Sequence, residues 1–310
     1  MVKYHVDMKK KQIKKHFSSY WPLYIMLVPV LTYYIIFSYT PMYGIVIAFK
    51  DYKIRKGILQ SDWVGFEHFA RFFSAYNFSN LLKNTLVLSV YSLLVGFPIP
   101  IIFALLLNYS TKPILKKVVQ MMSYAPHFIS TVVICCIIKL LFMPSTGAVN
   151  IILQVLGQES VNFLGDAKIF KHIYVWSGVW QSTGWDAIIY ISALAGVDPA
   201  LHEAAIVDGA TKIQRMRYVD LPSITSTVVM LLILRLGGIM NVGFEKAYLL
   251  KNDMNSAASS IISTYVYEQG LQGAQYDYST AVGLFNTIIN VILLVSCNTF
   301  CKKVLKESLF

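Results

Sequence analysis

Six long apolar stretches constrain this chain of 310 residues more than any other feature. They lie at about 21–48, 85–107, 127–143, 169–197, 223–250 and 280–301. An α-helix needs about 20 predominantly apolar residues to cross the hydrocarbon core of a bilayer. Because a spanning segment must satisfy its own backbone hydrogen bonds, stretches of this length predict helices. We therefore expect an all-α integral membrane protein with six transmembrane helices.

Composition excludes a water-soluble protein. Apolar residues make up 56% of the chain and charged residues 14%, and the mean hydropathy is +0.55. A soluble globular chain has about 45–50% apolar and about 25% charged residues. The net charge of +11 is concentrated in short clusters between the apolar stretches. This distribution is typical of membrane orientation and not of nucleic-acid binding.

Lysine and arginine are divided unevenly between the two sides that six spans would create. Fifteen lie in the N-terminal segment, the second and fourth links and the C-terminal tail, whereas eight lie in the other links. Positive charge accumulates on the cytoplasmic side of membrane proteins. We therefore expect both termini in the cytoplasm, with residues 1–19 as a basic cytoplasmic segment and residues 20–310 as one six-helix domain.

The sequence carries no motif for catalysis or for a bound cofactor. It has no Gly-Lys dipeptide and hence no phosphate-binding Walker loop. His202-Glu203 does not begin a zinc-protease motif, because Ile206 occupies the position of the second histidine. The four cysteines lie in apolar stretches, and we interpret them as small buried side chains. We expect no enzyme activity, no metal and no cofactor on this chain.

One polar link, residues 198–222, breaks the membrane pattern. It is too polar to span and yet rich in helix-forming residues. Asp198 is a suitable N-cap, with Pro199 at the first helical position. Gly209 can end this short helix in a left-handed conformation. We also expect Glu203 to lie near the positive end of the helix, where a carboxylate is favoured and offers an anchoring charge.

The same link contains a long spaced motif. Glu203-Ala204-Ala205 is followed after three residues by Gly209, and then by Val219 and Leu221-Pro222. This pattern resembles the EAA motif of permease subunits of ABC importers, in which the segment is a coupling helix that docks in a cleft of the ATPase subunit. The resemblance implies ATPase-coupling roles for Glu203, Ala204, Ala205, Asp208, Gly209, Leu221 and Pro222. The alternative is a solvated loop with one helical turn.

The resemblance extends along the whole chain. Tyr39–Gly44, Ala48–Tyr52, Trp63–Phe66 and Gly283–Phe285 are similar to segments of carbohydrate-importer permeases of the LplB type. It implies the type I ABC importer permease fold in a bacterial plasma membrane. It also implies four kinds of partner: a second permease subunit, two ATPase subunits that bind ATP and Mg²⁺, an extracellular substrate-binding protein, and an oligosaccharide or complex glycan.

Charged side chains inside a span are costly and are therefore candidates for function. Arg235 and Asp186 lie near the middle of the fifth and fourth stretches. Sugars require hydrogen-bonding groups and a flat aromatic surface, which neighbouring residues supply. The candidates for the substrate pathway are Gln181, Ser182, Trp185, Asp186, Arg235, Gly238, Asn241, Val242 and Glu245. We expect Arg235, Gly238, Val242 and Glu245 to share one helical face. The alternative is that Arg235 and Asp186 form a purely structural ion pair.

Two classes of function remain after these arguments. The leading hypothesis is the permease subunit of an ATP-driven saccharide importer that works by alternating access. The alternative is a secondary transporter or channel that works without an ATPase. The absence of detectable inverted repeats and paired broken helices disfavours this alternative.

Overall fold

The structure, a computed structural model, describes residues 20–304. The chain forms two compact units with the boundary between Phe66 and Glu67. The basic segment 1–19, for which we expect a cytoplasmic location, lies outside the described residues.

The first unit consists of a long helical segment, Tyr20–Phe49, and a short β-hairpin. The segment ends in the π-helix η1 (Ile35–Tyr39), α2 (Thr40–Met42) and the 3-10 helix η2 (Tyr43–Phe49). Strand β1 (Lys50–Asp51) pairs antiparallel with β2 (Asp62–Trp63), and α3 (Gly57–Gln60) lies between them in the chain. The rings of Phe49 and Trp63 stack with centroids 5.8 Å apart, which anchors the hairpin to the end of the helix.

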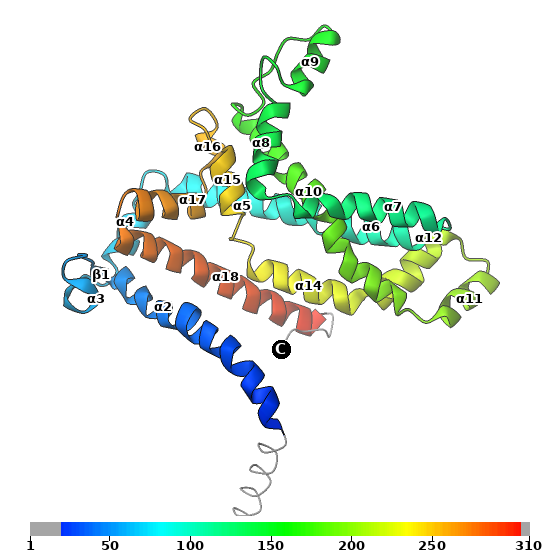
Figure 1. Ribbon diagram of the computed structural model, residues 1–310, viewed down its shortest axis with the longest axis horizontal. Helices are drawn as coiled ribbons and strands as arrows, with labels where there is room; N and C mark the ends of the chain where they lie inside the picture. Colours follow the sequence, from blue (N-terminus) through cyan, green and yellow to red (C-terminus); the bar gives the residue numbers. More distant parts are fainter. Residues whose placement is uncertain (1–19, 305–310) are drawn as a thin grey trace, which may run out of the picture. The chain divides into compact units, whose positions relative to one another are not determined.

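The described part of the second unit is helical (Figure 1). In chain order its helices are α4 (Glu67–Phe73), α5 (Phe78–Gly96), α6 (Pro98–Asn108), α7 (Pro113–Tyr124), η3 (Ala125–Phe128), α8 (Thr131–Leu141), α9 (Ala148–Val155), α10 (Ala167–Ala195), α11 (Pro199–Val207), α12 (Lys212–Arg215), η4 (Met216–Asp220), α13 (Leu221–Ser223), α14 (Thr225–Gly237), α15 (Phe244–Leu250), α16 (Ser256–Ser259), α17 (Ile262–Tyr267), η5 (Glu268–Gln272) and α18 (Tyr276–Val304).

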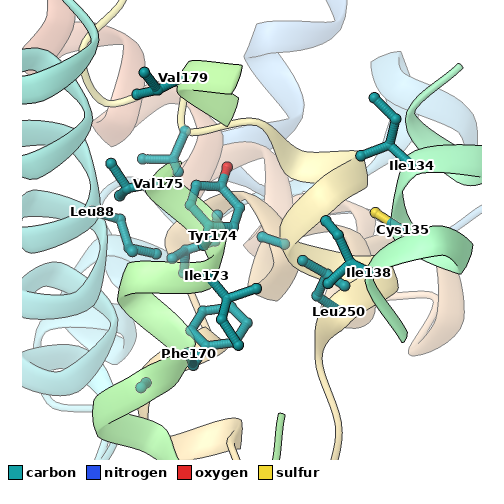
Figure 2. Packing of buried hydrophobic residues seen from close by; sticks show 14 residues of the cluster. Leu88, Ile134, Cys135, Ile138, Phe170, Ile173, Tyr174, Val175, Val179 and Leu250 are labelled. Carbon is teal, nitrogen blue, oxygen red and sulfur yellow. The ribbon is translucent and has the colours of Figure 1, made fainter. Parts of the chain in front are cut away.

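Helix α10 is central to the packing of the second unit. It contacts α5, α6, α7 and α16, whereas α18 packs along α14 and α17. A buried apolar cluster joins Leu88 of α5, Ile134 and Ile138 of α8, and Phe170 and Tyr174 of α10 (Figure 2). Helices in a bilayer associate through such close packing, because lipid tails are as apolar as the side chains.

Local signals explain where several of these helices begin. The Asp166 side chain accepts a hydrogen bond from Lys168 N at 2.7 Å and caps α10. Ser130 caps α8 in the same way through Val133 N. Pro98 and Pro113 occupy the first turns of α6 and α7, where the missing N–H breaks no helical hydrogen bond.

Three described helices are long and apolar enough to cross a membrane: Tyr20–Phe49, Phe78–Asn108 and Tyr276–Lys303. The number rises to five if each of two bent pairs counts as one span. These pairs are Pro113–Phe128 with Thr131–Leu141, bent by 100°, and Lys212–Ser223 with Thr225–Gly237, bent by 64°. Helix α10, our fourth predicted span, has 29 residues but contains polar groups such as Gln181 and Asp186 and is less apolar. The helical architecture is confirmed, and the count of six transmembrane helices stays a prediction.

Two predicted spans are not continuous helices. The stretch 127–143 contains a sharp bend, because Pro126 lies in η3 and α8 starts only after Ser130. The stretch 223–250 is interrupted at residues 238–243, between α14 and α15. The prediction that Arg235, Gly238, Val242 and Glu245 share one helical face was therefore wrong. Two consecutive glycines at 237 and 238 favour a break at this point, because glycine is a poor helix former.

Candidate functional site

The link that carries the spaced motif folds into a capped helix, α11. The Asp198 side chain accepts a hydrogen bond from Ala200 N at 2.9 Å, and Pro199 is the first helical residue. At the other end Gly209 has a φ of 77°, in the left-handed region. Ala210 N donates to Ala205 O at 2.9 Å, which completes the C-terminal cap. The predictions for both ends of this helix are confirmed.

One face of α11 is available to a partner. Glu203, Ala204 and Asp208 are exposed, and so are the apolar side chains of Ile206 and Val207. Glu203 is the fifth residue of the helix and not part of its first turn, which contains no acidic residue. The attraction of a carboxylate to the helix N-terminus falls off within the first turn. The prediction that Glu203 lies near the positive helix end was therefore wrong, although its carboxylate does face solvent.

The second half of the link leads into α14. Thr211 and Gln214 form a reciprocal capping box at the start of α12, with hydrogen bonds of 2.7 and 3.3 Å. The chain then continues through η4 into α13, where Leu221 and Pro222 are exposed. The motif residues thus lie on α11, its C-terminal turn, η4 and α13.

A partly buried polar cluster contacts α11 through His202. The sequence did not predict this cluster. The Asp220 side chain is completely buried, and His202 Nε2 of α11 lies 3.2 Å from its Oδ1. The ring of Tyr109, at the end of α6, packs edge to face with His202. The guanidinium of Arg215 lies 5.5 Å from the centre of that tyrosine ring. Burial raises the pKa of Tyr109, and the negative charge of the nearby Asp220 carboxylate raises it further, so the phenol stays protonated.

The substrate-pathway candidates are distributed over two cavities. Arg235, Gly238, Asn241 and Val242 line a cavity of about 210 Å³, together with Ser89, Ser92 and Tyr174. Trp185 and Asp186 line a second cavity of about 330 Å³, and Arg235 contributes to both. Neither cavity is lined by Gln181, Ser182 or Glu245.

The Arg235 guanidinium donates a hydrogen bond to Asp186 Oδ2 and forms an ion pair with it. The contact joins α14 to α10 between the two cavities. Both side chains are partly exposed, at 39% and 24%. The pair therefore fits a structural role and a role in the substrate pathway equally well, and both alternatives given by the sequence stay open.

Trp185 forms part of an aromatic surface that the sequence did not predict. The imidazole of His127 stacks on the indole with a centroid distance of 4.3 Å and an interplanar angle of 1°. Phe128 packs against the same indole edge to face. His127 and Phe128 belong to η3, at the bend before α8. Gln181 Nε2 donates to Ile129 O at this bend, which gives Gln181 a structural contact.

A buried charge that sequence analysis missed belongs to Lys246 in α15. Its side chain is almost inaccessible, and Nζ donates to Tyr174 O at 2.9 Å. Nζ also lies 5.0 Å from the centre of the Tyr174 ring. Of the cysteines, Cys135 and Cys301 are buried, whereas Cys136 is exposed, contrary to the interpretation that all four are buried. Within residues 20–304 no three His, Cys, Asp or Glu side chains gather in a metal-binding arrangement.

Comparison with known proteins agrees with the spaced motif. Residues 70–304 match the family model of the binding-protein-dependent transport system inner membrane component. Protein LplB of Bacillus subtilis (strain 168) is 44% identical over 288 residues, which cover 93% of this chain and 91% of that protein. The polygalacturonan/rhamnogalacturonan transport system permease protein YteP of the same organism is 43% identical over 288 residues, with 93% and 90% covered.

The fold is also similar to that of solved transporters. A chain of a bacterial ABC transporter involved in the import of the acidic polysaccharide alginate superposes with a TM-score of 0.87. It is 40% identical, and the match covers 94% of this chain and 99% of that chain. Proteins of this kind are transport subunits and not enzymes. The chain described here therefore belongs to the family of binding-protein-dependent transport system inner membrane components.

Proposed function

We propose that this chain is the permease subunit of an ATP-driven importer of an oligosaccharide or complex glycan. The observation that carries the proposal is the capped, exposed helix α11 with its motif residues, because such a surface suits docking to an ATPase subunit. The substrate class is supported by the relatives YteP and the alginate transporter, whose names give polysaccharides as their cargo.

The subunit spans the membrane six times in this proposal. The three apolar helices, the two bent pairs and α10 together make six spans, in which α7 and α12, the lysine- and arginine-bearing first helices of the two pairs, lie at the cytoplasmic ends. An even number leaves both termini on one side, and the excess of lysine and arginine in the second and fourth links and at both ends makes that side cytoplasmic. Helix α11 then faces the cytoplasm, where ATP is available.

One six-helix subunit forms half of a translocation pathway, so a second permease subunit, which we expect to be a different chain, completes it. Two ATPase subunits supply ATP binding and hydrolysis. An external binding protein delivers the glycan, as in the solved alginate transporter in complex with a pentasaccharide-bound periplasmic protein. Transport proceeds by alternating access between an inward-open and an outward-open state. ATP can drive this change only if it binds the complex more tightly in one state than in the other.

The test is uptake by the complete complex reconstituted in proteoliposomes, with a panel of labelled neutral and acidic oligosaccharides. We expect accumulation that requires both ATP and the binding protein. Liposomes that contain only this chain, under an imposed proton or sodium gradient, are the control. Uptake into these control liposomes, or ATP-independent uptake by the full complex, would support the secondary transporter or channel and overturn the proposal.

A further inference from the structure

The smaller cavity is bordered by the break between α14 and α15, which exposes backbone groups at residues 238–243. Non-helical backbone at membrane depth must be satisfied by neighbouring groups. Helix α18 supplies one of them: Asn290 Oδ1 accepts a hydrogen bond of 2.9 Å from Met240 N. The Asn290 side chain is buried, with 6% of its surface exposed.

This single backbone contact determines the orientation of three side-chain amides. A backbone N–H can only donate, so the Asn290 atom that faces Met240 must be the carbonyl oxygen. The Asn290 amide nitrogen then faces Asn241 at 3.2 Å, and Asn241 must present its own Oδ1 as the acceptor. Asn286 Nδ2, also of α18, donates to the same Oδ1 at 3.1 Å.

The remaining end of Asn241 is consequently a donor. Its Nδ2 makes no hydrogen bond within residues 20–304, and the side chain is exposed and lines the cavity. Ser89, Ser92 and Arg235 line the same cavity, so the wall offers hydroxyl, guanidinium and amide N–H groups. Hydroxyl, ring and glycosidic oxygens of a saccharide can accept hydrogen bonds from these groups.

Asn286 makes this contact at a cost. Its Oδ1 is buried and has no hydrogen-bond partner among the described residues. A buried polar atom without a partner destabilises a protein. Stability therefore does not explain an asparagine at position 286. The orientation that Asn286 imposes on Asn241 does explain it, because that orientation serves function.

We propose that Asn286 and Asn290 are positioning residues that hold Asn241 with its amide N–H groups directed into the translocation cavity, where they donate to saccharide oxygens. This inference rests on the proposed function. Asn290 acts through the backbone of the helix break as well as through Asn241. Asn286 acts through the Asn241 side chain and is therefore the better subject for a test.

The experiment compares Asn241→Leu, Asn286→Leu and the double variant in the complete reconstituted importer, with an oligosaccharide that the wild type transports. The readout is the number of sugar molecules imported per ATP hydrolysed. We expect each single variant to lower this ratio about fivefold, the factor that corresponds to loss of one ordinary hydrogen bond. The double variant should equal Asn241→Leu alone, because Asn286 acts only through Asn241.

A near-isosteric variant keeps the test valid if Asn286→Leu disturbs assembly. Asn286→Asp removes the donor and places a carboxylate acceptor opposite Asn241 Oδ1, which disfavours the Asn241 orientation that Asn290 supports; the ratio should fall as in Asn286→Leu. Thr287→Val, which changes the next residue of α18, should leave the ratio unchanged. Independent, multiplying losses in the double variant, or normal transport by Asn241→Leu, would overturn the inference. Failure of the wild type to import any saccharide would instead overturn the proposed function.

Discussion

His202 Nε2 and Asp220 Oδ1 lie 3.2 Å apart, and this contact ties α11 to the segment that leads into α14. One residue belongs to the helix that we propose docks on the ATPase. The other is completely buried and is followed directly by Leu221-Pro222. A displacement of α11 would therefore be transmitted to α14, which lines both cavities through Arg235.

We expect Asp220→Ala to uncouple ATP hydrolysis from uptake and to lower the free energy of unfolding, because it removes the buried carboxylate that lies against His202 of α11. Uptake, ATP turnover and thermal unfolding of the purified complex provide the measurements. Asp208→Asn, which neutralises an exposed carboxylate on the same link, should change stability by less than about 0.5 kcal/mol. Equal stability of the two variants would contradict the prediction.

Glu203→Lys should reduce co-purification of the ATPase subunits about tenfold, since it reverses an exposed charge at the proposed docking face. The affinity of the external binding protein for its glycan should not change. Glu159→Lys reverses another exposed charge, in the link between α9 and α10, and serves as the matched control. Normal ATPase recovery with Glu203→Lys would argue against docking through α11.

Gly209→Val should also weaken coupling, because a β-branched residue is strained at a φ of 77°. The expected cost is about 1–3 kcal/mol, which disfavours the turn that ends α11. Asparagine tolerates left-handed conformations, so Gly209→Asn should retain most of the activity. The comparison is made by ATP turnover stimulated by the loaded binding protein, and equal turnover in both variants would exclude a role for the turn.

Arg235→Ala should weaken uptake without preventing assembly, because it removes a cation from the walls of both cavities. The exchanged double variant, Asp186→Arg with Arg235→Asp, distinguishes the two interpretations of the ion pair. A purely structural pair would be restored by the exchange, and both uptake and thermal stability would recover. We expect stability to recover and uptake to remain low, since the guanidinium then belongs to a different helix.

Gly184→Ala should destabilise the second unit by about 1–3 kcal/mol, the usual cost of overpacking. A methyl group at this position of α10 would collide with the backbone carbonyl of Ser123, in α7. Gly283→Ala is the control, because a methyl group at that helical position would have no neighbour within 4 Å. The unfolding temperature in detergent should fall for Gly184→Ala and rise for Gly283→Ala, because alanine favours a helix more than glycine does where there is space for the methyl group.

Purified by itself, this chain should neither bind nor hydrolyse ATP, because its sequence contains no phosphate-binding loop. A nucleotide-binding assay and a phosphate-release assay check this expectation on a preparation shown by mass spectrometry to lack ATPase subunits. Specific turnover in such a preparation would require a nucleotide site that the sequence does not indicate.

The membrane class, the family and both ends of α11 followed from the sequence by itself, because each depends on local information. Long apolar stretches have few alternatives to membrane helices, and the Asp198 cap and the Gly209 turn involve residues within one short link. The tertiary structure decided the interruption between α14 and α15, the His202–Asp220 contact and the asparagine cluster. Asn290 and Met240 are 50 residues apart, and nothing in the pattern around either residue indicates the other. The packing of α18 against α14 brings these amides beside the broken helix, so the donor that faces the cavity is determined by the fold.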